Sequence, residues 1–370
     1  MLAHHYPDWG RTENRKRFKP AIGRVDLGHQ TTIMVSPLLT MTSLKPRQIL
    51  RFAGWAALAL TTGWISQFAE RAFRAIEPVG SVGLRKDVPY RLVAGAPLLL
   101  DVYFPPAQGD RMRGAVARPA ILLVHGGSWI GGTRRLLRPG PGNPRPMAIQ
   151  LAEAGYVVVA ADYRLARPDR AAWPSALDDL REAVRWTRRH AGELGIDADR
   201  IAAAGQSAGG HLAMLLGMIR LGDDEGTPAS RVRAVVSFYG PTDLTRLPLE
   251  RSRRLVHEPV DVFLGGDPLD PAGRVRAASP VHCIHDETCP MLLIHGTRDA
   301  WVPISQAEEL DAALARAGIA HRLVRVEGAR HGFDVDVRDP EVPGPLPRRL
   351  LPEILAFLEA CGMLPEGESP

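Results

Sequence analysis

The stretch AAAGQSAGGH (residues 202–211) decides how this chain is expected to fold. It places Ser207 between Gly205 and Gly209. The apolar run RIAAAG (200–205) precedes the serine, and a helical pattern follows it. Glycines on both sides of a serine allow a sharp turn from a strand into a helix, and such a turn exposes the hydroxyl at the edge of a sheet. Because the pentapeptide Gly-x-Ser-x-Gly also arises by chance, this interpretation depends on the neighbouring elements.

Short apolar runs alternate with longer helical patterns from residue 88 onward. Several runs are almost continuously apolar, as expected for strands that are covered on both faces. The alternation predicts an α/β fold, with a mostly parallel central sheet and helices on both faces. The expected strands are PLLLDVYF (97–104), AILLVHG (120–126), YVVVAADY (156–163), RIAAAG (200–205), AVVSFYG (234–240), MLLIHG (291–296) and HRLVRV (321–326).

Helices are expected between and after these strands. One has an apolar face at helical spacing, a second begins with a Ser-x-x-Glu capping box, and a third ends the domain. They are marked by Leu177, Leu180, Val184 and Thr187, by Ser305 with Glu308, and by PRRLLPEILAFLEACG (347–362).

Two segments lack such periodicity. TRRLLRPGPGNPRPM (133–147) is rich in arginine, proline and glycine, and we expect a surface loop there. Residues 241–290 are irregular and rich in proline, and they separate two expected strands. They are therefore expected to form an insertion over the edge of the sheet that holds Ser207.

Two further side chains follow expected strands in the order that a hydrolytic triad requires. Asp299 comes just after MLLIHG, and His331 comes just after HRLVRV. A serine hydroxyl is a poor nucleophile unless an imidazole removes its proton, and the imidazole needs a carboxylate to fix its tautomer. Taken alone, Asp299 is equally well explained as a helix cap, and His331 is equally well explained as a histidine in a loop. Together with Ser207, in this order and at three strand ends, they predict a Ser-His-Asp triad.

A glycine pair supplies an independent signal. VHGGSW (124–129) follows an expected strand, so the backbone N–H groups of Gly126 and Gly127 can point at a developing oxyanion. The N–H of Ala208, the residue after the serine, would join them. His125 is expected to be a structural residue that bonds this loop, because His331 already serves as the base.

Five motifs together resemble the α/β-hydrolase superfamily: HGGSW, DYRLA, GQSAGGH, HGTRDAWVP and GARHGF. The chain is most similar to its carboxylesterase-like branch, which includes hormone-sensitive-lipase-type and feruloyl-esterase-like enzymes. The resemblance covers about residues 85–362, the expected catalytic domain. Many relatives have a third glycine where this chain has Ser128. The roles that the resemblance implies are nucleophile for Ser207, base for His331, acid for Asp299, and oxyanion hole for Gly126, Gly127 and Ala208.

The positive charge of the chain is concentrated at its N-terminus. The formal net charge is +5, but residues 1–51 carry nine Lys/Arg and three Asp/Glu. The remaining residues are therefore close to neutral, which does not indicate a nucleic-acid-binding surface. We expect residues 1–51 to form an irregular basic leader, of which part precedes the true start if Met34 or Met41 initiates translation.

An uncharged stretch follows this leader. FAGWAALALTTGWISQFA (52–69) contains no charged residue and is preceded by Lys45, Arg47 and Arg51. A positive flank before an apolar segment predicts an export signal or a retained membrane anchor, with the hydrolase domain exported. The alternative is an amphipathic helix packed on a cytoplasmic domain.

Three cysteines do not make a disulfide framework. Cys283 and Cys289 lie close together in HCIHDETC, beside His282 and His285. A surface loop, a small disulfide in an exported protein and a zinc site all fit this cluster, although its spacing matches no common zinc pattern. No metal or cofactor is expected for the triad.

The leading interpretation is a serine esterase that acts on a small-molecule ester through an acyl-enzyme. A peptidase or amidase with the same triad is the nearest alternative, and an inactive binding member of the fold is a second. A dinucleotide-dependent oxidoreductase is excluded because no Gly-x-Gly-x-x-Gly follows a strand. Small acyl groups are expected, since neither the insertion nor SQFAERAFRAI (66–76) forms a long apolar lid. The side chains expected to line the acyl pocket are Leu244, Leu247, Val262, Phe263 and Leu264.

Overall fold

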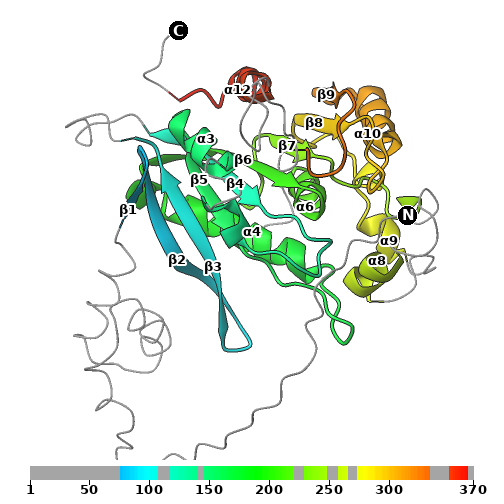
Figure 1. Ribbon diagram of the computed structural model, residues 1–370, viewed down its shortest axis with the longest axis horizontal. Helices are drawn as coiled ribbons and strands as arrows, with labels where there is room; N and C mark the ends of the chain where they lie inside the picture. Colours follow the sequence, from blue (N-terminus) through cyan, green and yellow to red (C-terminus); the bar gives the residue numbers. More distant parts are fainter. Residues whose placement is uncertain are drawn as a thin grey trace, which may run out of the picture. The chain divides into compact units, whose positions relative to one another are not determined.

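Runs of Val, Ile, Leu and Ala form the centre of a nine-stranded sheet (Figure 1). The computed structural model describes residues 76–106, 117–139, 146–220, 229–247, 257–265, 273–333 and 350–365. Within them the strand order is β1-β2-β3-β5-β4-β6-β7-β8-β9. The strands are β1 (Glu77–Val79), β2 (Val82–Val93), β3 (Ala96–Phe104), β4 (Arg118–Val124), β5 (Val157–Ala161), β6 (Ile196–Gln206), β7 (Val235–Phe238), β8 (Met291–Gly296) and β9 (His321–Val326).

The sheet is antiparallel at one end and parallel over the rest. β1, β2, β3 and β5 pair antiparallel, whereas β5, β4 and β6 to β9 run parallel to one another. Every residue of β5 is buried, which explains the continuously apolar run VVVAA in that strand. The predicted mostly parallel sheet is confirmed, and its parallel strands all end at one edge.

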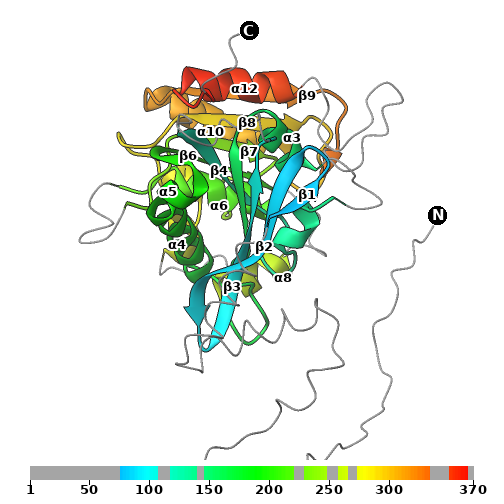
Figure 2. The same ribbon diagram turned by 90° about the vertical axis from the view of Figure 1, so that its left-hand side faces the viewer.

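Helices cover both faces of the sheet. Alternate side chains of β4 enter two separate hydrophobic cores: Leu122 and Val124 belong to the core that includes residues of α4, α6 and α10, whereas Ile121 and Leu123 belong to the core that includes residues of α3 and α12. In Figure 2 α12 lies at the top of the picture, above β8 and β9, whereas α4 lies at the left of the strands. The helices are α3 (Met147–Glu153), α4 (Ser175–Arg189), α5 (Ala191–Leu194), α6 (Ala208–Leu216), α8 (His257–Leu264), α9 (Arg274–Ala277), α10 (Ile304–Arg316) and α12 (Leu350–Ala360), with short 3-10 turns η2 (Arg134–Leu137) and η4 (Pro280–His282).

The structure differs from the local expectations at three places. β1 and β2 were not expected, because β2 mixes apolar with charged residues and its pairing with β3 is irregular. The capping box at Ser305 and Glu308 does not form: α10 begins at Ile304 without a side-chain cap, and Glu308 pairs with Arg325 of β9. The segment expected to be a surface loop contains η2, and the side chain of Arg134 there is buried.

The insertion between β7 and β8 packs onto the core. Its described parts include α8, α9 and η4. Leu244, Leu247, Phe263 and Leu264 are at most 2% exposed and belong to the core on the α6 side of the sheet. The prediction that they line an acyl pocket was therefore wrong, because they face core neighbours. Val262 is only half-buried against the same core.

The N-terminal predictions fall outside the described residues. These are the basic leader (1–51), the apolar segment (52–69) and nearly all of the amphipathic stretch 66–76. Among the residues that are described, no helix is both long enough and apolar enough to cross a membrane. Membrane attachment through residues 52–69 stays a prediction, which fractionation of cells that express the full chain would test.

The turn from β6 into α6 requires glycine on both sides of the serine. A Cβ on Gly205 would lie 2.4 Å from the carbonyl oxygen of Gly209, and one on Gly209 would lie 2.2 Å from that of Val124. Both distances are far below van der Waals contact, and the atoms met are backbone atoms that do not move freely. The glycines predicted to leave room for the turn therefore do so.

We predict that Gly209→Ala lowers the free energy of unfolding by at least about 2 kcal/mol, because the added methyl overpacks against the backbone of Val124 and His125. Gly192→Ala is the matched control: Gly192 lies in α5, and a Cβ there meets nothing within 4 Å. That change should be neutral or stabilise by up to about 1 kcal/mol. Denaturant unfolding of both variants measures the difference, and equal stabilities would contradict the close contact.

Candidate active site

Ser207 occupies the turn between β6 and α6. Its backbone has φ 52° and ψ −121°, a conformation that residues other than glycine seldom adopt. The backbone N–H of Ser207 donates to the carbonyl of Phe238, the last residue of β7, at 2.9 Å. The turn predicted from Gly-x-Ser-x-Gly is confirmed, and it sets the hydroxyl at the carboxyl edge of the parallel strands.

His331 and Asp299 lie at the same edge. The Nε2 atom of His331 is 2.9 Å from the Oγ of Ser207, and its Nδ1 atom is 2.7 Å from an Oδ2 of Asp299. A carboxylate only accepts hydrogen bonds, so Nδ1 carries the proton and Nε2 of the neutral ring accepts from the serine hydroxyl. The structure therefore joins three predicted residues from three strand ends in one hydrogen-bonded chain.

Asp299 is held in its charged form. Its Oδ1 accepts from the backbone N–H groups of Trp301 at 2.8 Å and Val302 at 2.9 Å. Burial by itself would raise the pKa of this carboxyl, but hydrogen bonds from His295 and His331 hold the pKa well below its usual range. Asp299 therefore stays negative at neutral pH and stabilises a positive charge on the His331 ring.

Two aromatic side chains flank the imidazole of His331. Tyr239 meets it edge to face with ring centres 4.6 Å apart, and Trp301 stacks on it at 6.2 Å. Tyr239 follows β7 and has a positive φ of 41°. These contacts limit rotation of the ring, so its two nitrogens stay aimed at Ser207 and Asp299.

The glycine loop, residues 125–133 between β4 and η2, lies beside Ser207. In the sheet Val124 pairs with Gly205, so the loop and the turn leave neighbouring strands at the same level. A Cβ on Gly126 would lie only 3.4 Å from that of Ser207. Gly127 has φ 126°, and a Cβ there would lie 2.3 Å from the carbonyl oxygen of Gly131. Only glycine fits at this position.

Three N–H groups are available around Ser207. Within the described residues, the backbone hydrogen bonds of loops and turns include none from the N–H of Gly126, Gly127 or Ala208. Ala208 is the first residue of α6, where helix N–H groups have no partner within the helix. Ser128, at the site of the family's third glycine, has φ 52°, so it adopts a conformation suited to glycine. Such an arrangement can stabilise negative charge on an oxygen bound next to the serine.

His125 has the contacts of a structural residue, as predicted. It is buried, its Nδ1 donates to the carbonyl of Gly126 at 2.8 Å, and its ring stacks on Tyr163 at 4.4 Å. The hydroxyl of Tyr163 donates to the carbonyl of His125 at 3.0 Å. These contacts fix the start of the glycine loop.

A second buried histidine, His211, lies beside the site and was not predicted from the sequence. Nδ1 of His211 accepts from the indole N–H of Trp129 at 3.2 Å, and its Nε2 donates to the carbonyl of Ala278 at 2.6 Å. Phe263 of α8 stacks on Trp129 at 4.8 Å. His211 thereby joins α6, the glycine loop and the insertion. Its place one helical turn after Ser207 is the signal that would have revealed it.

The Cys/His cluster does not form a disulfide. Cys283 and Cys289 are free thiols. His285 contacts the carbonyl of Met218 at 2.8 Å, and His282 lies 3.8 Å from Asp243. Among the described residues there is no group of three or more His, Cys, Asp or Glu side chains able to hold a metal ion.

Comparison with known proteins agrees with this geometry. A family model described as BD-FAE matches residues 100–314, more than half of the chain. The chain belongs to the BD-FAE family. It is an α/β hydrolase of the carboxylesterase-like type.

Among curated relatives of this BD-FAE member are two esterases of Mycobacterium tuberculosis (strain ATCC 25618 / H37Rv). Esterase LipQ is 30% identical over 67% of this chain and 57% of its own length. Esterase LipC is 32% identical over 59% of this chain and 53% of its own length. The chain thus spans about half the length of these relatives.

A solved structure extends the comparison. A thermophilic esterase from Thermogutta terrifontis superposes with a TM-score of 0.60 and 32% identity, covering 76% of this chain and 95% of that one. One structure of the same esterase has propionate bound; it is 30% identical with a TM-score of 0.60, and the match covers 80% of this chain and 98% of that one. Another has butyrate bound; it is 31% identical with a TM-score of 0.60, and the match covers 77% of this chain and 96% of that one. In another structure this esterase is phosphorylated by paraoxon; that structure is 28% identical with a TM-score of 0.58, and the match covers 78% of this chain and 96% of that one.

We predict that His211 makes stability depend on pH. Complete burial lowers the pKa of His211 from 6.5 to about 4. Between these values the unfolded chain binds a proton that the folded chain excludes, so the free energy of unfolding falls as pH drops through this window. The decrease attributable to His211 should reach roughly 3 kcal/mol at about pH 4 and vanish above neutral pH.

Urea unfolding of wild type and His211→Gln across this range measures the effect. Glutamine can accept from Trp129 and donate to Ala278, yet it does not titrate. As pH falls, the free energy of unfolding of wild type should decrease more than that of His211→Gln. A constant difference would show that His211 does not exclude its proton in the folded state.

Proposed function

We propose that this protein is a serine hydrolase that cleaves carboxylic esters with small acyl groups through an acyl-enzyme on Ser207. The observation that carries the proposal is the series of hydrogen bonds from Ser207 through His331 to Asp299, beside three backbone N–H groups that have no hydrogen-bond partner among the described residues. The named esterases among its relatives support ester hydrolysis over cleavage of amides.

In the proposed reaction Ser207 Oγ attacks the ester carbonyl carbon while Nε2 of His331 takes the hydroxyl proton. The carbonyl oxygen becomes an oxyanion, which the N–H groups of Gly126, Gly127 and Ala208 stabilise. Asp299 stabilises the imidazolium that forms. His331 then gives the proton to the leaving alcohol oxygen as the ester C–O bond breaks, and an acyl-enzyme remains.

The second half of the reaction repeats these roles with water. Nε2 of His331 takes a proton from a water molecule, whose oxygen attacks the acyl carbon. The same N–H groups stabilise the second tetrahedral intermediate. The proton returns to Ser207 Oγ as the acyl bond breaks, so the carboxylic acid leaves and the enzyme is restored.

We predict that Ser207→Ala abolishes labelling by a fluorophosphonate probe and lowers kcat for p-nitrophenyl acetate by at least about 10⁴-fold. His331→Ala should be nearly as damaging because the two residues act as one unit, and Asp299→Asn should cost somewhat less. Circular dichroism checks that each variant is folded. If Ser207→Ala keeps most of its activity, the assignment of the nucleophile is wrong.

We predict that kcat/KM is highest for acetyl to butyryl esters and falls for acyl chains of about twelve carbons. A long chain that finds no apolar surface forgoes about 0.8 kcal/mol of burial per CH₂. Structures of the Thermogutta esterase with propionate and with butyrate bound support a preference for small acyl groups. A series of p-nitrophenyl esters tests this. A maximum at long chains would make a lipase the better description, and probe labelling without hydrolysis of any ester would favour an amidase or peptidase.

A further inference from the structure

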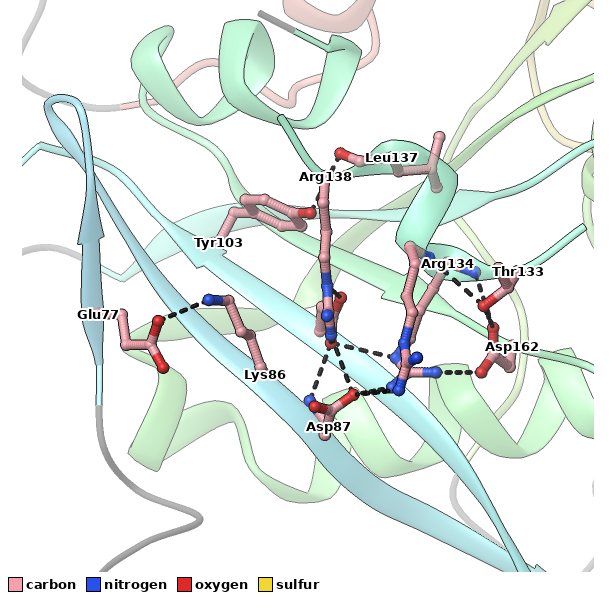
Figure 3. A network of polar contacts seen from close by, with 11 residues as sticks. Glu77, Lys86, Asp87, Tyr103, Thr133, Arg134, Leu137, Arg138 and Asp162 are labelled. Atoms are coloured by element: carbon pink, nitrogen blue, oxygen red, sulfur yellow. Dashed lines mark hydrogen bonds and ion pairs between the residues drawn. The ribbon is translucent and has the colours of Figure 1, made fainter. Parts of the chain in front are cut away.

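A buried arginine follows the glycine loop directly. Arg134, the first residue of η2, is 2% exposed, and its guanidinium contacts three carboxylates (Figure 3). These belong to Asp87 of β2, Asp101 of β3 and Asp162, the residue after β5. Arg138 contacts Asp87 and Asp101 as well. Removing charges from water is costly unless they are paired, so this cluster needs a physical reason.

Asp162 differs from Asp87 and Asp101 because it accepts hydrogen bonds from the residues at the end of the glycine loop. Its Oδ1 accepts from the backbone N–H of Arg134 at 2.7 Å and from the hydroxyl of Thr133 at 3.0 Å. Its Oδ2 pairs with the Arg134 guanidinium. Asp162 is itself fixed, because its backbone carbonyl accepts from the hydroxyl of Tyr90 in β2 at 2.6 Å. Asp162 therefore anchors the backbone at the far end of the glycine loop.

The segment after β5 holds the glycine loop at two further points. The hydroxyl of Tyr163 donates to the carbonyl of His125, where the loop begins. The N–H of Ala166 donates to the carbonyl of Trp129, at its middle, at 2.8 Å. One short segment thus contacts the loop at its start, middle and end.

The loop between these anchors adopts unfavourable backbone conformations. The φ angles of Gly127, Ser128, Trp129 and Gly132 are all positive, and two of these four residues are not glycine. Such conformations persist only where the surrounding structure imposes them. The end of the loop must therefore be fixed for the N–H groups at its start to keep their positions.

We propose that Asp162 is a positioning residue for the oxyanion hole. By holding Thr133 and Arg134, it fixes the loop that carries the N–H groups of Gly126 and Gly127. Arg134 neutralises Asp162 and ties it to the β2–β3 hairpin through Asp101. This inference rests on the proposed function, because a hydrolase needs these donors at hydrogen-bond distance from the oxyanion.

Asp101 provides a matched control. It is fully buried and contacts the same guanidinium, with its Oδ1 3.1 Å from Nε of Arg134. Its remaining contacts are with Arg138 and the N–H of Asp87, on the hairpin side. Truncation of either carboxylate removes one charge from the cluster, so both variants should lose stability. Only truncation of Asp162 releases the loop.

The experiment compares Asp162→Ala, Asp162→Asn and Asp101→Ala at a temperature where circular dichroism shows all to be folded. The readouts are kcat and KM for p-nitrophenyl acetate and the Ki of a trifluoromethyl ketone, whose adduct with serine has an oxyanion. In Asp162→Ala we expect kcat to fall about 10- to 100-fold with KM nearly unchanged, since small displacements of catalytic groups have effects of this order. The Ki should rise by the same factor as kcat/KM falls.

The conservative variant separates the hydrogen bonds from the charge. The amide oxygen in Asp162→Asn can still accept from Thr133 and from the N–H of Arg134, so kcat should recover to within about threefold of wild type. Asp101→Ala should also stay within about threefold, although it is destabilised. Equal losses of kcat in Asp101→Ala and Asp162→Ala would overturn the proposal, as would a wild-type kcat in Asp162→Ala.

A milder change covers the case in which Asp162→Ala does not fold. Thr133→Val removes one contact with Asp162 and should raise the Ki of the ketone and lower kcat by about threefold, in parallel. An unchanged Ki would then overturn the proposal. If wild type binds the ketone but hydrolyses no ester, the proposed function fails, whereas the comparison of Ki values still tests the role of Asp162.

Discussion

The close approach of β4 to the start of α6 is the constraint on which the site depends. The carbonyl oxygen of Val124 lies where a side chain at Gly209 would have to be. This contact brings the end of β4 against the turn that carries Ser207. As a result, the glycine loop and the serine are neighbours because of backbone packing at the centre of the sheet. Asp299 and His331 come from later parts of the chain, after β8 and β9, and lie around this contact.

Unfavourable backbone conformations are concentrated where the functional groups meet. Of the six non-glycine residues with positive φ in the described part of the chain, four lie in the serine turn, in the glycine loop or against His331: Ser207, Ser128, Trp129 and Tyr239. Each such residue raises the free energy of the folded state by roughly 1–3 kcal/mol. The two hydrophobic cores and the buried contacts of His125, His211 and Asp162 offset this strain. The fold thus holds polar groups in positions that they would not adopt in a free loop.

The parts that were predictable from the sequence are those whose signals are local. The β5 run is apolar throughout and the β8 run is apolar except for His295, because both faces are covered, and Gly205 and Gly209 mark the turn within five residues. Ser207, Asp299 and His331 each follow a strand that is recognisable in the sequence, so all three could be predicted to lie at the same edge of the sheet.

The remainder depended on partners that are distant in sequence. Arg134 looks like a surface residue until Asp87 and Asp101 of the hairpin and Asp162 come together around it. Ser305 and Glu308 match a capping box, but α10 already begins at Ile304, so Ser305 lies inside the helix. The carboxylate of Glu308 accepts a hydrogen bond from Arg325 of β9. The apolar residues of the insertion were assigned to a pocket because their burial against Trp129 and the core has no local signal.

The position of His331 relative to the strand order has a consequence for the proposed activity. Ser207 leaves β6 in the middle of the sheet, whereas His331 follows β9, which ends the described sheet and pairs with β8 alone. Of the side chains in β9 only Val326 is fully buried. Opening of an outer strand needs less free energy than unfolding of the core. The proposed catalysis therefore depends on the least buried of the strands that carry Ser207, Asp299 and His331, and local detachment of β9 would stop it while the centre of the molecule stays folded.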